Sequence, residues 1–169
     1  PRTVNYAPTY LGWLRPLDFS HARGFHETPF TLTLTNNSPG SSIVYSLDGS
    51  EPTLSYTNAL AINATKAVRA QAMRPGYKSA RSQTKTFIFI NDVIASPLMN
   101  TNVTRSPLYE ARLRPALRSL PTISVCVPGQ PEYAEKEGSV EILWPDGGED
   151  LQANCEVSRF GNAWTQFAK

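Results

Sequence analysis

The chain has 169 residues and a mass of 18.6 kDa, which allows one ordinary domain or two small ones. Hydrophobic residues make up 40% of it, which argues against a wholly disordered protein. The net charge of +2 is too small to indicate a partner such as nucleic acid or an anionic membrane surface. The sequence contains no long apolar run, so it predicts no transmembrane segment.

The chain contains 14 prolines and 10 glycines, which favour short strands and turns over a helix bundle. Residues 1–27 are poorly periodic, and we interpret them as an irregular N-terminal segment. Apolar and polar side chains alternate over residues 30–35, as is typical of a half-buried antiparallel strand. Comparable patterns predict strands at residues 43–47, 67–73 and 84–90. Four strands with turns between them predict a small β-sandwich over residues 28–91.

The character of the sequence changes after Asn91. We expect residues 92–120 to form a linker with a short helix. Ser106 and Pro107 make a good helix start, because Ser can cap a helix and Pro is tolerated in its first turn. Pro115 is expected to break or restart that helix.

The last part of the chain, residues 121–169, is expected to be β-rich. Strands are predicted over residues 121–127 and 139–144. The sequence PDGG at residues 145–148 predicts a hairpin turn, from which residues 151–160 could pair back. The predicted fold class is therefore mainly β, with a sandwich, a short helix and a few additional strands.

The nonapeptide YSLDGSEPT at residues 45–53 predicts a turn rather than a catalytic motif. Asp48 can accept a hydrogen bond from the backbone two residues on, and Gly49 accepts a positive φ. Pro52 sets the direction in which the chain leaves the turn.

The same nonapeptide resembles the signature YTLDGSEPT of the chitobiase/β-hexosaminidase C-terminal domain and its fibronectin-III-associated relatives. Further segments follow the order of that family: GFHETPF, SPGSSI, VRAQA and PGY at residues 24–30, 38–43, 68–72 and 75–77. The resemblance covers about residues 20–91. It implies an immunoglobulin-like module that usually serves as an accessory domain of secreted or surface proteins and carries no catalytic residue.

The second half resembles the start of the spore-coat CotH kinase-like domain. The similar segments are DVI, LRSLPTISV, GSVEI and CEVSRFGN at residues 92–94, 117–125, 138–142 and 155–162. The glycine-rich stretch of that family appears only as VSRFG at residues 157–161. The chain also ends before the region of the family's ATP- and metal-binding acidic residues, so we expect residues 121–169 to be a truncated N-terminal part without kinase activity.

No residue is predicted to be catalytic, and no metal or other cofactor is predicted. His21 and His26 are five residues apart in a predicted loop, which does not match the spacing of a helical metal pair. Carboxylates gather at two places: Glu132, Glu135 and Glu137, then Asp146, Glu149 and Asp150. A glycosidase-type pair and a Ca²⁺ site in the second group are alternatives, but we favour solvated loops.

Cys126 and Cys155 lie on two predicted strands. If those strands are adjacent, a disulfide would close about 30 residues and contribute roughly 3 kcal/mol. The alternative is two separate buried thiols.

Several aromatic side chains are candidates for contact with carbohydrate or with a partner. They are Trp13, Tyr56, Tyr77, Trp144 and Trp164, and Tyr10 belongs to the same set. Sugar binding requires two or three of them exposed on one surface, whereas core or interface packing is the commoner fate of such residues.

We predict a non-catalytic, extracytoplasmic module, periplasmic, at the cell surface or secreted, with a structural or protein-interaction role such as an accessory subunit of a larger assembly. The alternatives are a carbohydrate-binding accessory domain of a secreted or surface enzyme and a fragment of a CotH-like kinase. The expected partners are other protein subunits or domains of a longer chain. Because the sequence begins with Pro1 rather than Met, we interpret it as a mature or excised fragment. A large apolar surface on the irregular segments would favour the interaction module, and exposed coplanar aromatics would favour the carbohydrate-binding domain. A longer native chain that continues past Lys169 would favour the kinase fragment.

Overall fold

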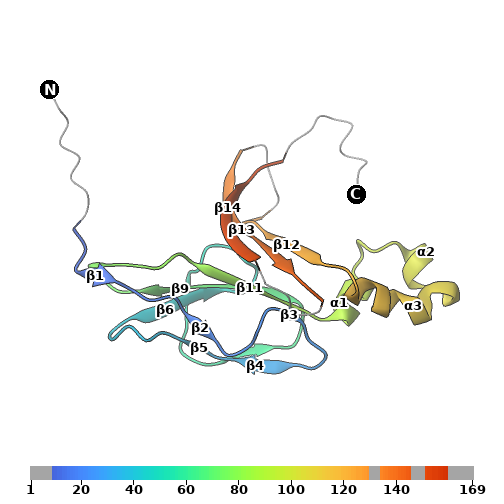
Figure 1. Cartoon of the computed structure of the whole chain (residues 1–169), viewed down its shortest axis with the longest axis horizontal. Helices are drawn as coiled ribbons and strands as arrows, with labels where there is room; N and C mark the ends of the chain where they lie inside the picture. Colours follow the sequence, from blue (N-terminus) through green and yellow to red (C-terminus); the bar gives the residue numbers. More distant parts are fainter. Residues whose placement is uncertain (1–8, 130–133, 146–150, 160–169) are drawn as a thin grey trace.

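The computed structural model describes residues 9–129, 134–145 and 151–159. In this part of the chain, a β-sandwich is followed by three helices and a separate three-stranded sheet (Figure 1). The predicted fold class, mainly β with a small sandwich, a short helix and additional strands, is confirmed.

The larger layer of the sandwich is a five-stranded sheet. Its strands are, in spatial order, β3 (Gly24–Phe25), β11 (Gln83–Ile88), β9 (Lys66–Met73), β6 (Ser42–Ser46) and β7 (Leu54–Ser55). All neighbours are antiparallel except β3, which pairs parallel to β11. The strands predicted at the positions of β6, β9 and β11 are confirmed, but β11 ends at Ile88 because Ile90 already opens a helix.

The second layer consists of short strand pairs, which Figure 1 shows below the five-stranded sheet. These pairs are β2 (Asp18–Phe19) with β5 (Leu34–Thr35), and β4 (Phe30–Leu32) with β8 (Leu60–Ile62). At one end, β1 (Gly12–Trp13) pairs parallel with β10 (Tyr77–Lys78).

The single strand predicted over residues 30–35 is wrong in one respect, because β4 and β5 are separate strands with different partners. The break falls at Thr33. Its backbone N–H donates to Ser20 Oγ at 2.9 Å, and its carbonyl oxygen accepts from the Ser20 backbone at the same distance. Ser20 directly follows β2, the partner of β5, so Thr33 is bonded to the β2 side and not to β8, the partner of β4.

The core lies between the two layers and is apolar. Its fully buried side chains, with an exposed fraction of 0%, are Leu32, Ile62, Val68, Ala70 and Phe87. Leu14 and Leu17 also belong to it. The structure therefore includes part of the segment before residue 28 in the sandwich, although this segment forms only two-residue strands.

The turn after β6 forms as its sequence predicts. Asp48 Oδ1 accepts hydrogen bonds from the Ser50 backbone N–H at 3.0 Å and from the Ser50 hydroxyl at 2.5 Å. Gly49 has a φ of +75°. The two bonds from Ser50 stabilise the ionised carboxylate and hold the pKa of Asp48 below its usual value.

Three helices project beyond one end of the sandwich (Figure 1). They are α1 (Ile90–Ala95), α2 (Thr101–Thr104) and α3 (Pro107–Arg118). The expectation that Pro115 breaks α3 is wrong, since the helix continues through it. Pro115 and Ala111 are both exposed, so water can reach the Ala111 carbonyl that loses its N–H partner. None of the helices in the described ranges is long and apolar enough to cross a membrane.

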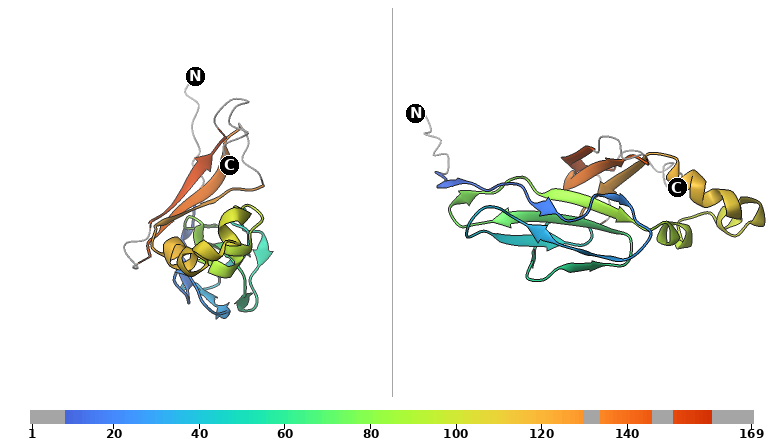
Figure 2. Two further views of the ribbon diagram at one scale, coloured as in Figure 1. Left: turned by 90° about the vertical axis from the view of Figure 1, so that its right-hand side faces the viewer. Right: turned by 60° about the horizontal axis from the view of Figure 1, so that its bottom comes forward.

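The three-stranded sheet contains β12 (Thr122–Cys126), β13 (Lys136–Leu143) and β14 (Leu151–Val157), with β13 in the centre and all neighbours antiparallel. These strands confirm the ones predicted for the last part of the chain. Figure 2 shows the sheet projecting from one side of the sandwich. It forms a third layer over the five-stranded sheet, which it contacts mainly through β11.

Candidate functional site

The two sheets meet through polar side chains. Ser139 Oγ on β13 donates to Thr84 Oγ1 on β11 at 2.8 Å, and both residues are fully buried. Asn154 Nδ2 on β14 donates to the Ser82 carbonyl oxygen at 3.0 Å. These hydrogen bonds set the position of β13 and β14 over the sandwich.

The centre of this interface is a buried carboxylate. Glu141 on β13 has an exposed fraction of 0%, and its Oε1 lies 3.1 Å from Nη1 of Arg23. The same carboxylate accepts hydrogen bonds from the backbone N–H of Thr86 at 3.3 Å and from the Thr86 hydroxyl. Thr86 Oγ1 also lies 2.8 Å from Ser124 Oγ on β12. A buried charge is tolerated only when it is paired in this way.

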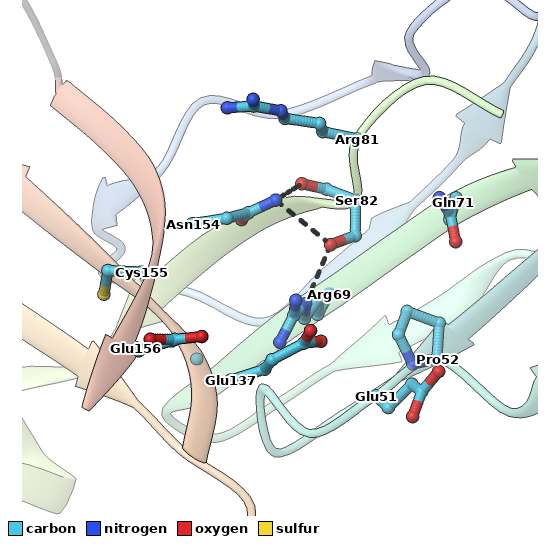
Figure 3. A pocket seen from close by; sticks show the side chains of 11 residues that line it. Glu51, Pro52, Arg69, Gln71, Arg81, Ser82, Glu137, Asn154, Cys155 and Glu156 are labelled. Atoms are coloured by element: carbon cyan, nitrogen blue, oxygen red, sulfur yellow. Dashed lines mark hydrogen bonds between the residues drawn. The ribbon is translucent and has the colours of Figure 1, made fainter. Parts of the chain in front are cut away.

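Beside these contacts the two sheets enclose a pocket of about 530 Å³ (Figure 3). β9 contributes Arg69 and Gln71 to it, and the facing strands contribute Glu137, Asn154 and Glu156. The other charged residues of its lining are Glu51 and Arg81. This is a polar cleft with charges of both signs.

Arg69 is the most buried of these charged side chains, with an exposed fraction of 6%. Its Nε donates to Ser82 Oγ at 3.0 Å, and Asn154 Nδ2 lies 3.4 Å from the same oxygen (Figure 3). The Ser82 hydroxyl accepts hydrogen bonds from these two donors. The cleft therefore presents oriented polar and charged groups to a ligand.

A second candidate site is an exposed aromatic cluster at the end of the sandwich formed by β1 and β10. Trp13 is 73% exposed and Tyr10 44% exposed. Tyr77 packs its ring over Gly12, where an added Cβ would lie 2.9 Å from Tyr77 Cε1. Lys78 Nζ lies 4.7 Å from the centroid of the Trp13 ring and 5.9 Å from that of Tyr10. We call Tyr10, Trp13 and Tyr77 the aromatic cluster.

The other predicted contact aromatics lie elsewhere. The Tyr56 ring packs against Tyr45 at 6.2 Å, and its hydroxyl accepts a hydrogen bond from the Leu34 N–H at 3.1 Å. Trp144 follows β13 and is 43% exposed. Trp164 is outside the described residues. The structure thus brings together Tyr10, Trp13 and Tyr77 from the predicted set.

The two cysteines are free, so of the two alternatives the structure has separate thiols rather than a disulfide. Their strands, β12 and β14, are not adjacent, because β13 lies between them. Cys126 is opposite Ser139, and Cys155 is opposite Gly138. Two strand spacings separate the Cα atoms by about 10 Å, whereas a disulfide needs less than about 7 Å. Burial is the main cause that raises the pKa of the Cys126 thiol.

The predicted histidines pack as aromatic side chains. His21 and His26 both contact the Phe30 ring, with ring centroids 4.2 and 4.5 Å away. Within the described ranges, no three His, Cys, Asp or Glu side chains gather in a way that could hold a metal ion. Of the two predicted acidic groups, Glu135 and Glu137 are described, and the remaining four residues lie outside the described part.

The face of the three-stranded sheet that points away from the sandwich is apolar, and sequence reasoning missed it. In the register of the strands, Ile123, Ile142 and Leu151 form one row across this face, and Val125, Val140 and Ala153 form the next. Ile123 is 65% exposed, Val125 54% and Leu151 48%. We call these six residues the outer face.

Comparison with known families supports the interpretation of the sandwich, whose turn at Asp48 and Gly49 has the expected geometry. Residues 21–86 match the chitobiase/beta-hexosaminidase C-terminal domain. The domain described by that family is a non-catalytic C-terminal domain. No curated protein and no solved structure matches the chain. The matched range ends before α1, so the resemblance of the second half to a CotH kinase-like domain stays an expectation.

Proposed function

We propose that the chain is a non-catalytic, extracytoplasmic interaction module, in which the chitobiase-type sandwich carries the three-stranded sheet as a docking surface. The partner is another protein subunit or a further domain of a longer chain. The observation that carries this proposal is the polarity of the three-stranded sheet. The side that faces the sandwich is covered, and it buries the polar residues Ser139 and Glu141 together with Leu143. On the other side, Ile123 and Val125 are more than half exposed.

An exposed apolar sheet face is unfavourable in water. Each large apolar side chain contributes about 1.5–3 kcal/mol when it is fully buried. The outer face has three such side chains at 48% exposure or more, side by side across three strands. Contiguous apolar patches of this kind mark surfaces that another macromolecule covers.

Helix α3 supports the same proposal. It has 12 residues, and none of them is buried. Helices of this length are marginal in water unless tertiary packing stabilises them. Leu108 is 72% exposed and Tyr109 44% exposed, so the helix offers apolar side chains to a partner. Arg114 bonds to Asn91 and Arg118 pairs with Glu27, which fastens α3 to the rest of the chain.

The direct test is site-specific crosslinking in the native source. A photoreactive amino acid at Ile123 or Val125 should crosslink to another protein or to a distant segment of the same polypeptide. The same amino acid at Thr57 or Asn58, which are exposed on the sandwich, is the control and should give little product. Native mass spectrometry should find the chain within a larger particle or polypeptide. A free chain of 18.6 kDa with no crosslinks from the outer face would overturn the proposal.

A second candidate function is carbohydrate binding by the aromatic cluster. Two of its rings are more than two-fifths exposed, as stacking on a sugar requires. Lys78 lies against Trp13 and Tyr10, and Arg74 lies 4.0 Å from the Tyr77 ring centroid, so a sugar would have to use the opposite ring faces. Titration with soluble oligosaccharides should change the tryptophan fluorescence of the natural chain and of Trp144→Phe, but not of Trp13→Ala. Binding that survives in Trp13→Ala would contradict this assignment.

A further inference from the structure

The charged groups of the pocket between β9, β13 and β14 are not paired with one another. Glu51, Glu137 and Glu156 line it together with Arg69 and Arg81. In the described part of the chain, no ion pair joins any of these five side chains to another residue. Four of these residues are exposed, so water solvates their charges, whereas Arg69 is buried without an ion-pair partner among the described residues.

Arg69 is the clearest case. Arg69 lies on β9 and has an exposed fraction of 6%. Its only side-chain hydrogen bond to a described residue runs from Nε to Ser82 Oγ. A guanidinium has five N–H donors, and a neutral hydroxyl does not balance its charge. Burial of such a cation costs free energy unless an anion accompanies it. The terminal nitrogens of Arg69 therefore suit a ligand carboxylate.

The position of Arg69 is held by its surroundings. Ser82 receives its hydrogen bond, and Asn154 Nδ2 in turn binds the carbonyl oxygen of Ser82 at 3.0 Å. Next to Arg69 on the same face of β9, Gln71 Nε2 donates to the Ala80 carbonyl oxygen at 2.8 Å. These contacts join β9, the loop before β11 and β14, so the guanidinium is oriented before any ligand arrives.

The facing wall of the pocket is acidic. Glu137 on β13 and Glu156 on β14 are directly opposite each other in the strand register. Like charges at such a position destabilise a sheet, and a cation placed between them removes that repulsion. Glu51 adds a third carboxylate to the pocket, from the loop after β6 on the side of the five-stranded sheet. The wall formed by β13 and β14 therefore suits an ammonium group.

The basic and the acidic side chains of the pocket together select the ligand. The arginines would attract a simple carboxylate, but the three glutamates would repel it. A simple amine would be attracted by the glutamates and repelled by the arginines. Only a molecule that carries both charges satisfies both walls. We propose that this pocket binds a small zwitterion, with its carboxylate on Arg69 and Arg81 and its ammonium group on Glu137 and Glu156. Amino acids and short peptides belong to this chemical class.

The experiment uses the full chain and a series of ω-amino acids from glycine to 6-aminohexanoate, in which the distance between the ammonium and carboxylate groups increases. Binding is followed by NMR titration and by calorimetry at low ionic strength. We expect one chain length to bind best, with a dissociation constant on the order of 1 mM. Hexanoate and hexylamine, which carry one charge each, should bind at least about tenfold more weakly, because each satisfies only one wall.

Two exposed pocket residues and two matched residues outside the pocket provide the variants. Arg81→Gln and Glu156→Gln should each weaken binding of the best ligand about tenfold, which corresponds to loss of one charged contact. Arg112→Gln and Glu135→Gln, at exposed positions outside the pocket, should leave it unchanged. Arg69→Lys tests whether the buried arginine contacts the ligand. If this variant does not fold, the binding measured with Arg81→Gln and Glu156→Gln tests the proposal.

Three results would overturn the proposal. These are no saturable binding by any member of the series, equal weakening in the pocket variants and their controls, or hexanoate binding as tight as that of the best amino acid. The pocket lies on the inner side of the three-stranded sheet and the proposed docking surface on its outer side. Failure of this experiment therefore leaves the docking proposal untouched.

Discussion

The sandwich and the three-stranded sheet use the same strand pattern with opposite results. In the sandwich, the apolar members of each alternating strand, such as Leu32 and Val68, point inward and are completely buried. In β13 the members that point toward the sandwich include Ser139 and Glu141 beside Leu143, whereas Val140 and Ile142 lie on the outer face. One sheet has buried its apolar side within the chain, and the other has not.

This difference teaches that alternation in a strand says which residues share a face but not which face is covered. The sandwich is stabilised mainly by removal of apolar area from water. The three-stranded sheet is attached mainly by hydrogen bonds and by the pair of Arg23 with Glu141. Such polar contacts orient surfaces well but stabilise them modestly. The apolar side of this sheet is then left for a partner.

The largest expected effect comes from breaking the polar attachment at its centre. Glu141→Ala should cost about 3–5 kcal/mol, because it removes the carboxylate that pairs with Arg23 and accepts from Thr86 within a buried site. Hydrogen exchange should show loss of protection in β13 and β14 before the sandwich. Glu137→Ala is the control, since it is an exposed glutamate on the same face of β13. Equal effects of the two variants would show that the buried pair does not hold the sheet.

The second comparison contrasts one apolar residue from each sheet. Leu32→Ala, at a residue with 0% exposure, should destabilise the chain by about 2–5 kcal/mol. Ile123→Ala, at a residue with 65% exposure, should change the stability of the isolated chain by less than about 0.5 kcal/mol. Urea unfolding measures both. A large cost for Ile123→Ala in the isolated chain would mean that its own residues already cover the outer face.

A pair of glycines tests how closely the sheet rests on the sandwich. Gly49 and Gly129 have φ angles of +75° and +69°, so both substitutions to alanine strain the backbone. A Cβ on Gly49 would lie 2.4 Å from the Cβ of Cys126 on β12, whereas nothing lies within 4 Å of one on Gly129. We expect Gly49→Ala to cost about 1–3 kcal/mol more than Gly129→Ala in thermal or urea unfolding. Equal costs would show that β12 moves away freely.

The smallest effects concern pH. The pKa of Asp48 is lowered, so the stability that this group contributes is present above its ordinary value of 3.8 and is lost as the pH falls through the folded-state value below it. Asp48→Asn should therefore flatten the acid side of the stability curve measured by urea unfolding between about pH 5 and pH 2. An unchanged acid limb in this variant would mean that the hydrogen bonds from Ser50 do not favour the ionised form.

Local features of the structure were predictable from the sequence. Asp48, Gly49 and Pro52 specify their turn through short-range chemistry, and alternation identified β6, β9 and β12 because the period of a strand is local. The predicted helix break at Pro115 was wrong, because α3 is exposed there and water can replace the lost backbone hydrogen bond. Leu14 and Leu17 carried no periodic signal, since both join the core from the loop between β1 and β2.

The candidate sites depend on contacts between residues far apart in the chain. Arg69 and Asn154 meet at Ser82, and Thr86 meets Glu141 across 55 positions of the sequence. No spacing rule connects such pairs. Likewise, the aromatic set contained Trp13 and Tyr77, but only the parallel pairing of β1 with β10 brings them together.

The sequence by itself determined that this is a mainly β protein, with a chitobiase-type sandwich and a defined turn, because strand period and turn chemistry act over a few residues. Only the tertiary structure decided which side of the three-stranded sheet is buried, and that Arg69 lies in a cleft opposite Glu137 and Glu156. The physical reason is that burial is a property of the partner surface. A strand offers two faces with equal geometry, and long-range hydrogen bonds select the one that is covered.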